Sequence, residues 1–85
     1  MEDRFILENK VRLARVEKGW TQAELAKNAG VSRQTIISIE SNRYNPSVTL
    51  AFILAKCLDK DINDIFVMHG PFDGQVKEVK KNENI

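Results

Sequence analysis

Residues 21–40, TQAELAKNAGVSRQTIISIE, decide the fold of this chain. Thr21 forms a capping box with the glutamate three residues later, and this pattern predicts the beginning of a helix. Gly30 supplies the left-handed residue that a sharp turn after such a helix requires. Ser32 is the expected cap of a further helix over residues 33–41. The stretch therefore predicts two short helices joined by a tight turn.

The second of these helices has an unusual outer face. When its residues are placed at about 100° intervals, Ile36, Ile39 and Glu40 fall on one side. The other side has Arg33 and Thr35 at its margins and contains no acid; its members are Gln34, Ile37, Ser38 and Ser41. An amide can pair with adenine, a guanidinium with guanine, and an apolar group can meet a thymine methyl. This face is therefore predicted to enter the major groove of DNA.

Length and composition restrict the class of protein. Eighty-five residues are enough for one small domain, and 42% hydrophobic and 29% charged residues are typical of a soluble globular chain. No apolar run approaches the roughly 18 residues that span a bilayer, and the first ten residues lack a secretory signal. Cys57, the single cysteine, is expected to be a buried small hydrophobe. These features predict a cytoplasmic protein without a membrane partner.

The distribution of charge is more informative than the net charge of +1. Residues 10–43 contain seven basic and three acidic side chains, a balance of +4. Residues 59–73 contain one basic and four acidic side chains, a balance of −3. A basic half with an acidic patch behind it is compatible with one face approaching phosphates, although mixed-charge surfaces are common in any soluble protein.

The remaining segments are also expected to be helical. Leu7, Val11 and Ala14 have the spacing of one helical face, and this first helix should end at Gly19. Trp20 is expected to anchor the core. Ser47 and Asp61 are predicted caps of a fourth and a fifth helix, whose apolar residues include Leu50, Ile53, Leu54, Cys57, Leu58, Ile62, Ile65 and Phe66. Because no stretch shows convincing strand alternation, the predicted fold class is all-α.

The chain is expected to divide into a domain and a tail. Residues 1–67 form the predicted helix-turn-helix domain, with the helix-turn-helix unit at 21–41, and residues 68–85 form a C-terminal tail of undecided structure. Three states are open for this polar tail: disorder, a strand or helix added to a dimer, or contact with DNA through Lys77, Lys80 and Lys81.

Residues 9–66 closely resemble the helix-turn-helix domain of phage repressors and Cro-type, XRE-like regulators of bacteria and archaea. The resemblance is carried by a combination of features: Arg15, TQAELA at 21–26, GVS at 30–32, Ile36, Ile39, Glu40 and NP at 45–46. It implies a five-helix, lambda-repressor-like fold. In that geometry the second and third helices form the DNA-binding unit, and the third lies in the major groove.

The resemblance also implies roles for individual residues. Contacts with bases are implied for the third helix, at Arg33, Gln34 and Ser38, with Thr35 contacting a base or a phosphate. Phosphate contacts are implied at Thr21, Gln22, Asn42, Arg43 and Tyr44. Gln22 is further expected to brace Gln34.

Three other positions complete the candidate site. Arg15 and Glu40 match an internal ion pair of the family, and Glu40 falls on the buried side of its helix, where a carboxylate requires a cationic partner. Position 37 is usually polar in the family, and here it is Ile37. Ile37 either touches a thymine methyl or packs against a neighbouring side chain, so it leaves open the base sequence that the protein reads.

Two functions of different classes follow. The first is a sequence-specific DNA-binding transcriptional regulator, expected to be a repressor, which binds a two-fold operator on double-stranded DNA as a homodimer. The alternative is a protein-interaction module such as an antitoxin, with an autoregulatory DNA-binding domain and a tail that binds a protein partner. No catalytic constellation, metal-ligand cluster or cofactor motif is recognisable, and the only histidine, His69, is expected in a turn. An enzyme, a metal and a cofactor are therefore not expected.

Overall fold

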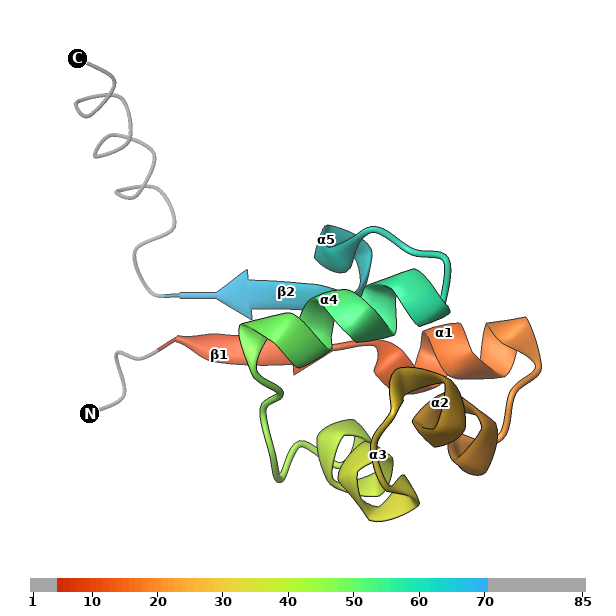
Figure 1. Cartoon of the computed structure of the whole chain (residues 1–85). Helices are drawn as coiled ribbons and strands as arrows, with labels where there is room; N and C mark the ends of the chain where they lie inside the picture. Colours follow the sequence, from red (N-terminus) through yellow and green to blue (C-terminus); the bar gives the residue numbers. More distant parts are fainter. Residues whose placement is uncertain (1–4, 71–85) are drawn as a thin grey trace.

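Five helices and two strands make up residues 5–70, the part of the chain that the computed structural model describes (Figure 1). In chain order the elements are β1 (Ile6–Asn9), α1 (Val11–Lys18), α2 (Gln22–Ala29), α3 (Arg33–Glu40), α4 (Val48–Cys57), α5 (Ile62–Ile65) and β2 (Phe66–His69). Figure 1 shows α2 and α3 together at the lower end of the molecule, away from β2 and α5.

The predicted N-terminal caps of three helices are confirmed. At α2 the capping box is complete: the Glu24 backbone N–H donates to Thr21 Oγ1 at 3.0 Å, and the Thr21 backbone N–H donates to Glu24 Oε1 at 2.7 Å. Ser32 and Ser47 each accept one backbone N–H at the beginning of α3 and α4. Asp61 occupies the cap position of α5, but its side chain makes no capping hydrogen bond.

The first four helices also end in one common way. Each is followed by a residue with positive φ, and the next residue's N–H donates to the carbonyl five positions earlier. This pair of features is the Schellman motif. Glycine takes the left-handed position after α1 and α2, whereas Asn42 (φ 63°) and Asp59 (φ 57°) take it after α3 and α4. The two glycine ends are those that the sequence predicts.

The hydrophobic core lies where the five helices meet. Its largest fully buried side chains come from every helix and are Val11, Leu25, Ile36, Ile39, Leu54 and Ile65. Trp20, the expected core anchor, packs against this cluster from its edge. Since α3 contributes two fully buried isoleucines, the direction of its outer face is fixed by the core.

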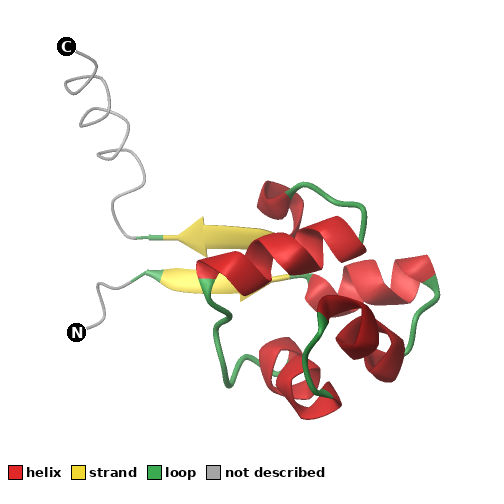
Figure 2. Ribbon diagram, in the orientation of Figure 1, coloured by secondary structure: helices red, strands yellow, loops and turns green. Residues whose placement is uncertain are grey.

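The predicted fold class is confirmed in part: the domain is mainly helical, but β1 and β2 add a two-stranded antiparallel sheet that an all-α fold lacks (Figure 2). The register pairs Ile6 with His69 and Asn9 with Phe66. Leu7 therefore lies in a strand, and α1 begins only at Val11. Four-residue strands are too short for alternation to be recognised, and the pairing partner lies at the other end of the domain.

Strand β2 also runs across position 67, where the predicted domain ends, and it includes Phe66, which the sequence assigns to the fifth helix. Most of the predicted tail, residues 71–85 with its three lysines, lies outside the described residues. Within residues 5–70, no helix is long and apolar enough to cross a membrane.

We expect Leu54→Ala to lower the free energy of unfolding by about 2–5 kcal/mol, because it removes buried apolar atoms and leaves a cavity. Lys56→Ala is the control: it truncates an exposed side chain of the same helix and should cost much less. Denaturant unfolding followed by circular dichroism measures both. Equal costs would contradict the central position of Leu54 in the core.

Candidate nucleic-acid interface

The outer face of α3 carries the five predicted base-contacting residues, and none of them is fully buried. Arg33 and Gln34 are exposed, whereas Thr35, Ile37 and Ser38 are half-buried. A shallow surface groove of about 370 Å³ is lined by Ser32, Gln34, Thr35, Ser38 and Tyr44. The structure thus brings three predicted base-contacting side chains together with Tyr44 from the following loop. Arg33 stands outside this groove, at the first position of α3.

The hydroxyl groups at the N-termini of α2 and α3 make hydrogen bonds within the domain and can still form others. Ser32 Oγ lies 2.9 Å from Thr35 Oγ1 and also accepts the Thr35 backbone N–H at 3.1 Å. Thr21 is exposed, and its hydroxyl oxygen accepts the capping hydrogen bond of α2. A hydroxyl group has one donor and two acceptor sites. Thr21 can therefore cap its helix and still donate to a phosphate oxygen.

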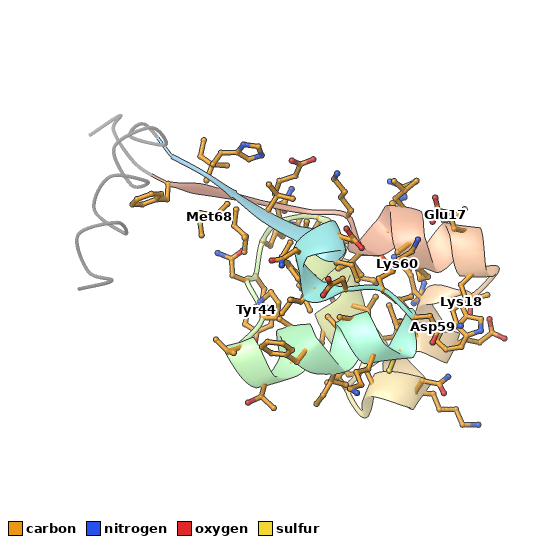
Figure 3. The ribbon with its side chains drawn as sticks, turned by 90° about the horizontal axis from the view of Figure 1, so that it is seen from above. Glu17, Lys18, Tyr44, Asp59, Lys60 and Met68 are labelled. Carbon is orange, nitrogen blue, oxygen red and sulfur yellow. The ribbon has the colours of Figure 1, made fainter. Side chains whose placement is uncertain are left out.

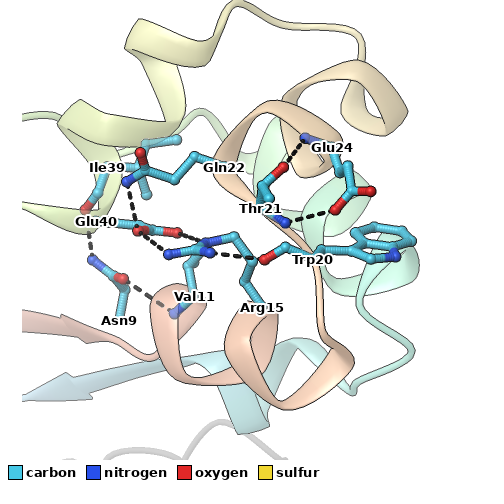
Figure 4. A network of polar contacts seen from close by, with 9 residues as sticks. All are labelled: Asn9, Val11, Arg15, Trp20, Thr21, Gln22, Glu24, Ile39 and Glu40. Atoms are coloured by element: carbon cyan, nitrogen blue, oxygen red, sulfur yellow. Dashed lines mark hydrogen bonds and ion pairs between the residues drawn. The ribbon is translucent and has the colours of Figure 1, made fainter.

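A partly buried polar network joins Arg15, Glu40 and Gln22 (Figure 4). Arg15 Nε lies 2.7 Å from Glu40 Oε2, and Arg15 Nη2 donates to Glu40 Oε1 at 3.2 Å. The third donor group, Nη1, reaches the Trp20 carbonyl at 2.8 Å. The two charged side chains are only 12% and 5% exposed. Such two-pronged pairing is the strong geometry for a guanidinium and a carboxylate.

Gln22 joins this network, and this differs from the expectation that it braces Gln34. Its Nε2 donates to Glu40 Oε1 at 3.1 Å, and no hydrogen bond joins it to Gln34 within residues 5–70. The physical reason is that Glu40, buried on the inner side of α3, requires more donors than Arg15 alone supplies. A primary amide has two N–H groups, so Gln22 retains one for another acceptor.

A second groove, of about 460 Å³, lies beside this network and contains Ile37. It is lined by Arg12, Arg15, Gln22, Ile37, Glu40 and Ser41. Arg12, which the sequence analysis counts only as part of the basic half, is exposed and shares this groove. Its position three residues before Arg15 on α1 is the pattern that could have identified it, because residues i and i+3 lie on one side of a helix.

The loop at residues 42–44 is exposed and begins just after Ser41, the C-terminal cap of α3. Asn42 adopts the left-handed conformation, and the Arg43 N–H donates to the Ser38 carbonyl at 2.9 Å. Asn9, which sequence reasoning does not single out, contacts this loop: its Nδ2 donates to Asn42 Oδ1 at 2.9 Å. Asparagine two residues before a helix is a recognisable turn pattern, but it does not reveal a distant partner.

Charge is distributed unevenly over the described surface. Two ion pairs, Lys18 with Asp59 and Lys60 with Glu17, join α1 to the segment between α4 and α5. Figure 3 shows both pairs on the right of the view, away from Tyr44. The hydrogen bond from the Lys18 ammonium lowers the pKa of the Asp59 carboxyl.

In contrast, Arg33 and Arg43 have no carboxylate partner among residues 5–70. Glu40 is the single acid of α3 and of the 42–44 loop, and it is neutralised by Arg15. The α3 face therefore offers free positive charge and neutral hydrogen-bonding groups.

A tight two-helix unit with a polar, solvent-facing second helix defines a DNA-binding protein of the helix-turn-helix class. A sequence profile of the helix-turn-helix family matches residues 11–65. The chain belongs to this family of DNA-binding transcriptional regulators, and its resemblance to XRE-like regulators is confirmed.

Individual relatives agree with this membership. An uncharacterized HTH-type transcriptional regulator of Methanocaldococcus jannaschii is 49% identical over 61 residues, which are 72% of this chain and 92% of the relative. Antitoxin HipB of Escherichia coli K12 is 40% identical over 53 residues, 62% of this chain and 60% of HipB. Among solved structures, SinR of Bacillus subtilis in complex with DNA superposes with a TM-score of 0.61 at 34% identity, covering 64% of this chain and 87% of the SinR chain.

We expect Glu40→Ala to lower the free energy of unfolding by about 3–5 kcal/mol, because it leaves the Arg15 guanidinium buried without a counter-charge. Replacing the exposed Asp59 by Ala removes an ion pair of similar length and should change the stability little. Thermal and denaturant unfolding compare the two variants. A small loss for Glu40→Ala would show that the buried pair is not a major structural contact.

Proposed function

We propose that this chain is a sequence-specific transcriptional regulator that inserts α3 into the major groove of its operator and represses transcription as a homodimer. The observation that carries the proposal is the outer face of α3, which combines Gln34, Thr35 and Ser38 in one groove and contains no free carboxylate. Side chains of these types read base edges, and an unpaired arginine adds an attractive charge for phosphates.

Base contacts are proposed for the exposed side of α3, from Arg33, Gln34, Thr35, Ile37 and Ser38. Phosphate contacts are proposed for both ends of the helix-turn-helix unit, from Thr21, Gln22, Asn42, Arg43 and Tyr44. The N-terminus of α2 adds backbone donors, which favour an anion. The buried pair of Arg15 and Glu40 serves as a structural support that holds α1 and α3 together.

A homodimer is proposed because specific operators of this class pair two half-sites about 34–36 Å apart. Exposed apolar side chains support this assignment. Ile6 and Met68 on the sheet and Val48 and Phe52 on α4 leave 53–72% of their surface exposed, and none of them belongs to the proposed DNA-contacting set. Covering apolar surface of this kind is a common driving force for association.

Selection of bound duplexes from a random DNA pool tests the proposal as a whole. A palindromic consensus is the expected result, since it follows from two copies related by a two-fold axis. Absence of any enriched sequence would contradict sequence-specific recognition.

Gln34→Ala tests direct readout. We expect it to weaken binding to the selected duplex by about 1–3 kcal/mol and to relax specificity at one base pair, because the bidentate contact with a base is lost. Binding to an unrelated duplex should hardly change. An equal loss on both duplexes, measured by fluorescence anisotropy, would remove Gln34 from the base-contacting set.

Arg43→Ala tests the phosphate contacts. We expect weaker binding to every duplex and a smaller slope of log K against log salt, by about 0.9 for one phosphate contact. Lys56→Ala, an exposed basic residue of α4, is the matched control and should leave the slope unchanged. If both variants gave the wild-type slope, Arg43 would not contact the backbone.

The relation to HipB favours one further candidate, an antitoxin-like module whose DNA-binding domain is autoregulatory. In that case the part of the tail that follows β2 would bind a protein partner and gain its structure only in that partner's presence. NMR amide resonances of the protein, recorded with and without a candidate toxin, test this alternative. A tail that is already ordered in the free dimer would contradict it.

A further inference from the structure

The side chain of Asn9 joins three parts of the domain at one point. Asn9 is the last residue of β1, and its Oδ1 accepts the Val11 backbone N–H at 3.2 Å, at the beginning of α1. Its Nδ2 donates to the Ile39 carbonyl at 3.0 Å and to Asn42 Oδ1 at 2.9 Å. Figure 4 shows Asn9 between Val11 and Ile39. One amide therefore connects β1, α1 and the end of α3.

The Asn9 side chain contacts the end of α3, where the backbone turns into the 42–44 loop. Asn42 adopts a left-handed backbone conformation, which is unfavourable for residues other than glycine and least so for asparagine and aspartate. The Ile39 carbonyl accepts both the Asn42 N–H and the Asn9 amide. These contacts hold the backbone at the point that decides the direction in which Arg43 leaves the helix.

Asn9 is itself held firmly on both sides. The Lys10 N–H that follows it donates to the Ile65 carbonyl at 2.7 Å, and Asn9 pairs with Phe66 in the sheet. Glu8 is the residue before Asn9, and its Oε1 lies 2.9 Å from His69 Nε2 on the neighbouring strand. A side chain on so fixed a backbone can position a partner that follows it by 33 residues.

We propose that Asn9 is a positioning residue for DNA binding, which clamps the end of α3 and orients the 42–44 loop so that Arg43 reaches the phosphate backbone. The inference rests on the proposed function, because it assumes that this loop contacts DNA. Asn9 itself contacts no DNA in this scheme; it acts through Asn42 and Arg43.

Two substitutions remove the contacts of Asn9 with Ile39 and Asn42 but keep its contact with the Val11 N–H at the beginning of α1. Asn9→Asp keeps an acceptor for the Val11 N–H, but it has no donor for the Ile39 carbonyl and places a carboxylate beside Asn42 Oδ1. Asn9→Ser also keeps an acceptor, adds no charge and is too short to reach Asn42. Asn9→Ser therefore serves if the charged variant fails to fold.

The test is a double-mutant cycle on the full chain with a duplex selected from the random pool and an unrelated duplex. In the wild-type background we expect Asn9→Asp or Asn9→Ser to weaken binding to both duplexes about tenfold and to lower the salt slope by about 0.9, with an unchanged ratio between duplexes. In the Arg43→Ala background the same substitution should have little further effect, because the residue that the clamp positions is gone.

A second readout does not depend on DNA. Hydrogen exchange of the Arg43 amide, which is bonded to the Ser38 carbonyl, should become faster in both Asn9 variants. The Val11 amide, at the beginning of α1, should keep its protection. Faster exchange at Val11 alone would assign Asn9 a purely local role and overturn the inference.

The binding outcomes distinguish this inference from the function on which it rests. If Arg43→Ala lowers the salt slope but the Asn9 variants have no effect, or have an equal effect in both backgrounds, the inference fails and the proposed function stands. A wild-type chain that binds neither duplex would overturn the proposed function, and this inference with it.

Discussion

The structure depends on one buried carboxylate. Glu40 lies at the end of α3 with its side chain 5% exposed, and an ionised group in such a place is costly unless its oxygens are fully hydrogen-bonded. Arg15 from α1 and Gln22 from α2 supply those hydrogen bonds. The two donors belong to different helices. The Glu40 carboxylate therefore makes all of these hydrogen bonds only when α1, α2 and α3 are correctly packed against one another. No buried side-chain nitrogen or oxygen in residues 5–70 is left without a partner.

This constraint also shapes the electrostatics of the proposed interface. The acid of α3 is neutralised by Arg15. Among the described acids of the patch behind it, Asp59 and Asp61 lie between α4 and α5, and Asp64 lies in α5. Lysines near that patch are engaged in ion pairs, whereas Arg33 and Arg43 are free of them within the described chain. A nearly neutral chain can thus present a locally positive surface, and net charge is a poor guide to what it binds.

Local features of the sequence predicted the helices, because caps and glycine ends act over three to five residues. The Arg15–Glu40 contact was also expected, because the family resemblance pairs these two positions and a glutamate on the buried side of a helix requires a cationic partner. The strands were missed for the opposite reason: each has only four residues, and its partner is remote in sequence. The same distance concealed Asn9, whose residue type indicates a turn but cannot reveal Asn42. Gln22 was expected to contact Gln34, and its contact with Glu40 depends on the three-dimensional position of that carboxylate, which the sequence does not reveal.

The small sheet has a consequence for the order in which the domain assembles. Helices with their own caps form from neighbouring residues, whereas β1 and β2 join residues that are remote in the chain, such as Glu8 and His69, which are 61 positions apart. Closing so long a loop carries an entropic cost that is recovered only after the intervening helices have packed. We therefore expect the two strands to pair last during folding. Helix α3 would then form early, while the orientation of the 42–44 loop would be completed only when the two ends of the domain meet.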